Sequence, residues 1–262
     1  MQVSLEIISV LFLVAFVAST LDTIAGGGGL ITLPAILMAG FDPVQALGTS
    51  KFQASVGSVT ASVAYARRGL IQWRKQRLTV FISFLGGATG AMMANMLSKE
   101  ILQIAVPILL ICVALYFYFS PKLSNENRKA KMPALAFQLS VIPLIAFYDG
   151  IFGPGAGSFF TASFTGLMGF AILQAIAHAK LANTASNIGA LLVFALHGAV
   201  VISVAIPMAA GAVLGAQVGA RVAVRYGGKL IKPLIIVVSL IMAGKLLLDP
   251  TNPLMQMFGL RY

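Results

Sequence analysis

The chain has 262 residues, of which 59% are hydrophobic, and its formal net charge is +11. Only 10% of the residues are charged and the mean hydropathy is +0.95, whereas a soluble domain carries about 25% charged residues. So few charges exclude both a soluble surface and a disordered chain. The apolar residues lie in long runs, and about 20 such residues form a helix that crosses a bilayer.

The apolar runs predict about eight membrane-spanning helices. They lie at residues 4–24, 43–65, 78–97, 101–119, 134–152, 171–196, 199–220 and 231–248. The first run follows no basic segment and precedes no small-residue cleavage site, so it is expected to be a span rather than a signal peptide. The runs lack the polar–apolar alternation of β-barrel strands. The fold class is therefore an all-α polytopic membrane protein.

Two shorter apolar pieces, 30–40 and 158–169, fit no full span. Each follows a glycine-rich break, at Gly26–Gly29 and at 153–157. At about 1.5 Å per residue each piece is roughly 18 Å long as a helix, about half of a membrane. We expect each to be a half-length helix.

The two halves of the chain resemble one another. When the sequence is shifted by 129 positions, residues 26–69 align with 155–198 without gaps, and 11 of 44 positions are identical, Lys51 and Lys180 among them. The sequence therefore predicts two homologous repeats of four spans, each with one glycine-broken half-length helix: 1–119, a basic cytoplasmic linker at 120–133, and 134–262. Internal repeats that carry interrupted helices are typical of secondary transporters.

The basic residues constrain the orientation of the spans. Thirteen of the 18 lie in three clusters, interpreted as loops: Arg67, Arg68, Arg74, Lys75, Arg77; Lys122, Arg128, Lys129, Lys131; Arg221, Arg225, Lys229, Lys232. If the half-length pieces return to the side from which they entered, the third cluster faces away from the other two. If each completes an extra crossing, all three clusters share one face and the repeats are inverted, with both termini in the periplasm. The positive-inside rule favours the second topology, and the length of the pieces favours the first.

Two lysines lie where charge is costly. Lys51 and Lys180 are each about eight or nine residues into a predicted helix, which is roughly 12–14 Å deep. An intramembrane charge costs at least about 2.5 kcal/mol and marks a candidate functional site. The alternatives are a structural ion pair or a side chain that extends to the helix end.

Asp22 and Asp149 end the first and fifth spans just before the breaks. They are candidates to carry a coupling proton, to pair with the lysines, or to cap the following half-helix. The breaks themselves, with candidate residues Gly26, Gly27, Gly28, Gly29, Gly155 and Gly157, either serve helix packing or expose helix N-termini that bind anions.

Polar residues near the lysines complete the candidate site. They are Thr49, Ser50 and Gln53 beside Lys51, and His178, Asn183 and Asn187 beside Lys180. Such side chains hydrogen-bond an oxyanion or join helices. His178 is a further candidate for proton coupling, because histidine titrates near neutral pH. With one Cys and two His, the sequence predicts no metal site and no cofactor.

The sequence resembles the sulfite exporter family TauE/SafE. The resemblance rests on residues 22–34, 46–51 and 65–69 in the first half and on 149–157 and 177–183 in the second. It covers nearly the whole chain, and within the family it is closest to the bacterial branch described as probable membrane transporters. It implies an inner-membrane transporter of small anions such as sulfite, sulfoacetate or related sulfur compounds.

The hypothesis from the sequence is therefore a secondary transporter that exports sulfite or an organosulfonate across the bacterial inner membrane by alternating access. Its expected partners are a small anion and the lipid bilayer. The excess of basic residues is interpreted as orienting the protein in the membrane and not as binding nucleic acid. A homo-oligomer is compatible with the sequence. The alternatives are a passive anion channel and a non-transporting membrane scaffold. An enzyme is not expected, because no nucleophile–base pair is present.

Overall fold

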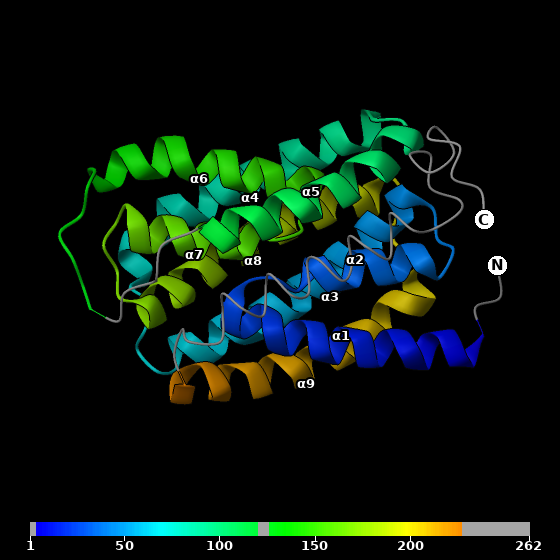
Figure 1. Cartoon of the computed structure of the whole chain (residues 1–262), viewed down its shortest axis with the longest axis horizontal. Helices are drawn as coiled ribbons and strands as arrows, with labels where there is room; N and C mark the ends of the chain where they lie inside the picture. The colour runs from blue at the N-terminus through cyan, green and yellow to red at the C-terminus, as the bar shows by residue number, and fades with distance from the viewer. Residues whose placement is uncertain (1–3, 120–125, 227–262) are drawn as a thin grey trace.

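A computed structural model describes residues 4–119 and 126–226 of the chain, and all regular structure in these two ranges is helical. The helices are α1 (Leu5–Ala25), α2 (Gly29–Met38), α3 (Pro43–Ala66), α4 (Trp73–Met96), α5 (Lys99–Phe119), α6 (Ala134–Ile151), α7 (Ala156–Gly166), α8 (Ile172–Leu196) and α9 (Ile202–Tyr226). They form an elongated bundle (Figure 1).

Five helices among the described residues are long and apolar enough to cross a membrane: α1, α4, α6, α8 and α9. The chain is thus a multi-pass membrane protein. The expected spans at 43–65 and 101–119 correspond to α3 and α5, and the expected span at 231–248 lies outside the described residues. The two half-length pieces are helices, α2 with 10 residues and α7 with 11.

Glycine contacts reveal the directions of the helices. A Cβ added at Gly211 of α9 would lie 2.4 Å from the Phe12 carbonyl oxygen of α1, and one at Gly215 would lie 2.1 Å from that of Phe16. The residue numbers of the contacts rise in the same direction along both helices, so α1 and α9 are parallel. Gly48 and Gly57 of α3 face Ala199 and Ala212 in the same way, so α3 is parallel to α9 as well.

Helices α4 and α6 run the other way. Gly86 of α4 faces Ala146 of α6 and Gly90 faces Gly150, so these two helices are parallel to each other. A short turn joins α3 to α4 and reverses the chain, as Figure 1 shows. Helix α1 therefore runs antiparallel to α6, and α2 returns the chain to the end of the bundle at which α1 began.

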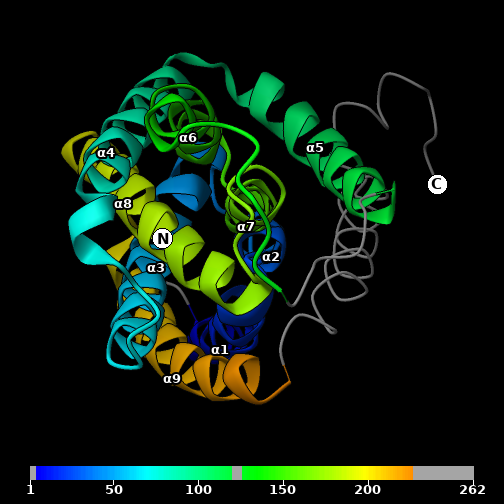
Figure 2. The ribbon, with the colours of Figure 1, turned by 90° about the vertical axis from the view of Figure 1, so that its left-hand side faces the viewer.

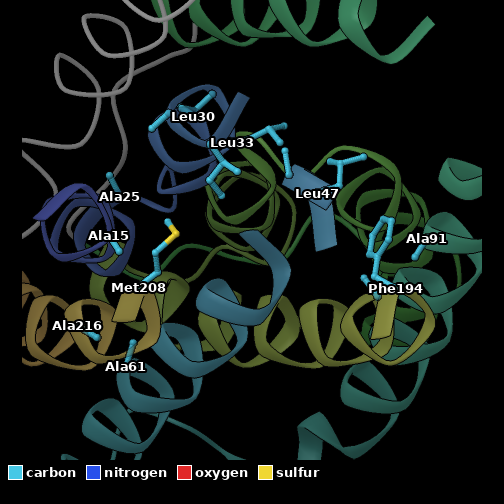
Figure 3. Packing of buried hydrophobic residues seen from close by; sticks show 14 of the residues in the cluster. Ala15, Ala25, Leu30, Leu33, Leu47, Ala61, Ala91, Phe194, Met208 and Ala216 are labelled. Atoms are coloured by element: carbon cyan, nitrogen blue, oxygen red, sulfur yellow. The ribbon is translucent and has the colours of Figure 1, made fainter. Parts of the chain in front are cut away.

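Small side chains permit this close packing. Ala15 of α1, Ala61 of α3 and Ala216 of α9 are fully buried, and Met208 fills the space between these helices (Figure 3). Small residues let helix backbones approach closely in a membrane. Helix α5 stands to one side of the bundle (Figure 2), and Lys99 at its start pairs with Asp42.

The described members of the three basic clusters gather at one end of the bundle. Arg68 Nη1 donates to the carbonyl of Ala220, which precedes the third cluster, at 2.9 Å. Lys75 of the first cluster and Arg128 of the second line one cavity together. These contacts bring members of all three clusters together, opposite the start of α1 (Figure 1). This is the arrangement expected if each half-length helix completes an extra crossing.

Two predicted boundaries are wrong. Helix α4 begins at Trp73 rather than at residue 78, and α9 ends at Tyr226 rather than at 220. The basic residues interpreted as loop residues therefore lie partly within helices: Arg74, Lys75, Arg77, Arg221 and Arg225. Their long side chains reach water from a helical backbone. Hydropathy alone therefore predicts helices that are too short at these two ends.

Gly215→Ala is expected to destabilise the bundle, because its Cβ would overlap the Phe16 carbonyl oxygen and separate α1 from α9. Overpacking of this kind costs about 1–3 kcal/mol. The measurement is the melting temperature of the purified protein in detergent. Gly166→Ala is the matched control, because an added Cβ there meets nothing within 4 Å; equal melting temperatures for the two variants contradict the packing account.

Candidate functional site

The two glycine breaks contact one another inside the bundle. Gly26 ends α1 with a left-handed φ of 83°, which favours glycine because it has no Cβ. The Ser158 N–H at the start of α7 donates to the Gly26 carbonyl at 3.1 Å, and the Ser158 hydroxyl donates to the Ala25 carbonyl at 2.6 Å. The end of α1 is thus bonded to the beginning of α7.

Lys51 of α3 pairs with Asp149 of α6. Its Nζ lies 2.7 Å from Asp149 Oδ1, and the two side chains are 4% and 2% exposed. The same ammonium group donates to Asn187 Oδ1 at 3.1 Å and to the Asp149 backbone carbonyl. All three of its N–H bonds therefore have acceptors.

The second oxygen of Asp149 is held by α8. Asn183 Nδ2 donates to Asp149 Oδ2 at 2.9 Å, and the Ser186 hydroxyl donates to the same oxygen. The carboxylate thus accepts from one ammonium, one amide and one hydroxyl group. Buried charges are retained only when they are paired and hydrogen-bonded in this way.

Lys180 of α8 pairs with Asp22 of α1. Its Nζ lies 2.6 Å from Asp22 Oδ2, with side chains 2% and 17% exposed. Asp22 Oδ1 accepts from the backbone N–H of Gly28 at 3.0 Å. Asp22 therefore pairs with a lysine, one of the roles that the sequence left open, and also accepts a bond from the residue that precedes the half-length helix α2.

The two ion pairs cross between the halves of the chain. Each lysine takes the aspartate that precedes the glycine break of the other half, over separations of 98 and 158 residues. Two ammonium groups and two carboxylates leave the region without net charge. The lysines are thus not free cations in this conformation, and an incoming anion must compete with a carboxylate.

A cavity of about 30 Å³ lies between the two breaks. Its lining includes both aspartates and one of the two lysines, Lys51. A space of this size holds about one or two water molecules or a comparably small ion. The Gln53 side chain, only 4% exposed, also lines the cavity.

The structure brings most of the predicted site residues to this cavity. The predicted residues that line it are Gly26, Gly28, Gly29, Gly157, Ser50, Lys51, Gln53, Asn183, Asn187, Asp22 and Asp149. Gly27, Gly155 and Lys180 belong to the breaks and the ion pairs but do not line the cavity.

Two predicted residues lie elsewhere. The Thr49 hydroxyl accepts from the Val201 N–H at 3.1 Å, where the chain enters α9. His178 Nδ1 donates to the Gln174 carbonyl at 2.8 Å, and its ring packs against Phe170 with centroids 4.9 Å apart. Neither side chain faces the cavity.

Sequence reasoning missed three contributors. Ser186 bonds Asp149, the Tyr65 hydroxyl donates to the Thr23 carbonyl at 2.8 Å, and the Tyr148 hydroxyl donates to the Pro154 carbonyl at 2.7 Å. Tyr65 thus holds the chain just before the first break, and Tyr148 holds it within the second. The spacing of Asn183, Ser186 and Asn187 on one helical face was the available signal for Ser186.

Comparisons with known proteins find one matching family and several curated relatives. Residues 11–246 match the family profile described as sulfite exporter TauE/SafE. The chain is 44% identical over 253 residues to "Probable membrane transporter protein ORF9" of Sinorhizobium sp, covering 97% of each chain. It is 44% identical over 248 residues to "Probable membrane transporter protein YfcA" of Escherichia coli K12, covering 95% of this chain and 92% of the relative. A Haemophilus influenzae "Probable membrane transporter protein" is 40% identical over 249 residues, covering 95% of this chain and 98% of the relative. No solved structure matches the chain significantly.

Proposed function

Because the chain belongs to the sulfite exporter TauE/SafE family, we propose that it is a secondary transporter that exports sulfite or an organosulfonate by alternating access. The observation that carries the proposal is the pair of crossed Lys–Asp contacts around a small cavity between two broken helices. Such a site offers cationic partners for an oxyanion at the place where the two halves of the bundle meet.

Charge balance suggests how the anion enters. With both ion pairs intact the region is neutral, and an added anion would leave an uncompensated charge among buried groups. Protonation of Asp22 or Asp149 releases its lysine, which then binds a singly charged anion, and the region stays neutral. The anion and a proton therefore occupy the site together, and export requires an outward anion gradient larger than the inward proton gradient.

Internal symmetry supports alternating access. The helix lengths run 21, 10, 24 and 24 residues in α1–α4 and 18, 11, 25 and 25 in α6–α9, and the first members of the two sets are antiparallel. We take these sets as the described parts of two inverted repeats, 1–119 and 134–262, that rock about the site they share.

The basic end of the bundle supports an orientation. Basic residues concentrate on the cytoplasmic side of membrane proteins, so the described basic clusters face the cytoplasm and α1 begins on the periplasmic side of a bacterial inner membrane. The linker 120–133 then lies in the cytoplasm.

The test is flux into and out of proteoliposomes that contain the purified protein. The anions are sulfite, sulfate, thiosulfate, a sulfonate and a carboxylate, each measured with and without a pH gradient. We expect sulfite or the sulfonate to move, and to respond to the gradient. Asp22→Asn or Asp149→Asn removes a proton acceptor from the cavity, so at least one of these variants should transport without responding to the gradient.

The matched control is Asp42→Asn, which removes a carboxylate that pairs with Lys99 outside the cavity and should leave the pH response intact. Sulfite flux that ignores the gradient in the unaltered protein supports a passive channel instead. The absence of flux for every anion supports a scaffold and contradicts the proposal.

A further inference from the structure

A second cavity, of about 470 Å³, opens at the basic end of the bundle and shares no lining residue with the central one. We call it the basic-end cavity. It lies between the beginnings of α4, α6 and α8, the end of α7 and residues 127–130. Its volume falls in the range of about 300–1,000 Å³ that is typical of small-molecule sites.

One wall of the basic-end cavity is aromatic. Phe137, Phe164 and Phe170 line it. Phe164 meets Phe137 edge-on with centroids 5.0 Å apart and stacks on Phe170 at 5.8 Å. Because these rings are held by one another, the wall is a preformed apolar surface.

The rest of the lining is electropositive. Lys75 and Arg128 border the cavity, and no carboxylate is among its described lining residues. The first turns of α4, α6 and α8 also border it, and in none of them does the side chain of the N-cap residue bond the helix. The backbone N–H of Ala171 before α8 donates to Asn127 Oδ1 at 2.7 Å, and that of Gln72 before α4 donates to His178 Nε2 at 3.5 Å. The N–H groups of the first helical turns still carry partial positive charge, which favours anions.

Gln76 adds a buried amide to the lining of the basic-end cavity. It lines the cavity and is 6% exposed, yet its Oε1 has no hydrogen-bond partner among the described residues. The neighbouring Gln138 amide, in contrast, donates to the Lys75 carbonyl and to Thr79 Oγ1, both at 3.1 Å. A buried amide atom without a partner is unfavourable, and a rotated Gln76 amide can donate Nε2–H to an anion beside Lys75.

We propose that the basic-end cavity is a second binding site, for a molecule with an anionic head group (sulfonate, phosphate or carboxylate) joined to an apolar part. Lys75, Arg128 and the Gln76 amide bind the head group, and the phenylalanine wall packs against the apolar part. Both a soluble organic anion and an anionic phospholipid have this chemistry. The site is separate from the crossed ion pairs and does not depend on the transport proposal.

The test has two arms, both on the purified full-length chain. In the first, isothermal titration calorimetry in detergent measures the binding of benzenesulfonate. In the second, native mass spectrometry measures the retention of phosphatidylglycerol against phosphatidylcholine. We expect binding in at least one arm, and Lys75→Gln and Arg128→Gln should each weaken it about tenfold, because each removes one charge-assisted bond.

Arg74→Gln and Lys129→Gln are the matched controls, since each removes a neighbouring basic residue that does not line the cavity. Asp22→Asn, which alters the central cavity, should also leave this binding unchanged, so failure of the transport proposal is distinguishable from failure of this one. Melting temperatures confirm that the variants fold. Binding in neither arm, or binding that Lys75→Gln and Arg128→Gln leave unchanged, overturns the inference.

Discussion

Lys51→Ala is expected to abolish anion transport and to lower the free energy of unfolding by about 3–5 kcal/mol, because removal of one partner leaves the buried charge of the other uncompensated. The partner left behind is Asp149, whose side chain is 2% exposed. Two measurements check the expectation: sulfite flux in proteoliposomes, and the fraction of protein that stays monodisperse after heating in detergent. The two losses need to be separated, because an unstable transporter is also inactive.

The double variant Lys51→Met/Asp149→Leu separates them. Replacing a buried ion pair with apolar residues of similar size is often neutral or stabilising, so the double variant should recover part of the lost stability but not transport. The recovery is incomplete because Asn183, Ser186 and Asn187 lose the hydrogen bonds that they make with the pair. Lys99→Ala is the matched control for loss of a lysine, since it breaks an exposed pair with Asp42 and should change neither property. If the double variant transports sulfite at the rate of the unaltered chain, Lys51 does not bind the substrate.

Gly26→Ala is expected to disrupt the contact between the two breaks. Its Cβ would lie 2.3 Å from the Gly157 carbonyl carbon, and Gly26 has a φ of +83°. The left-handed backbone costs about 1–2 kcal/mol for a residue with a Cβ, and overpacking adds about 1–3 kcal/mol. We expect a lower melting temperature and loss of transport, measured on the same preparation.

Gly69→Ala separates the two costs. Gly69 has a similar φ of +72°, but an added Cβ meets nothing within 4 Å. This variant should therefore carry only the backbone cost and should keep its transport activity. Equal losses in the two variants would show that backbone strain, and not the approach of the two breaks, explains the effect of Gly26→Ala.

Local patterns in the sequence predicted much of the fold. Hydropathy located helices that correspond to α1, α3, α4, α5, α6, α8 and α9, because an apolar run of about 20 residues has few alternatives to a helix in lipid. Helix ends were less accurate, as at Trp73 and Tyr226, because long basic side chains do not mark where a helix stops. The half-length helices were found from their glycine breaks.

The candidate site was partly predictable for a similar reason. A charge is so costly in an apolar span that Lys51, Lys180, Asp22 and Asp149 could be selected one at a time. His178 and Thr49 were selected because they are close in sequence to a lysine, but helical rotation and the packing of α7 and α9 direct them away from the cavity. The basic-end cavity was not predicted at all, since three helix starts from distant parts of the chain form it.

The sequence by itself determined that this is a helical membrane protein with two broken helices and four costly charges, because each of these properties depends on a residue and its immediate neighbours. Only the tertiary structure decided which charges meet. Lys51 contacts Asp149, and Lys180 contacts Asp22, because α1 and α6 run in opposite directions and the end of each of these helices lies against the lysine of the other half. Partners 98 and 158 residues apart are chosen by helix direction and close glycine contacts, which no local pattern encodes.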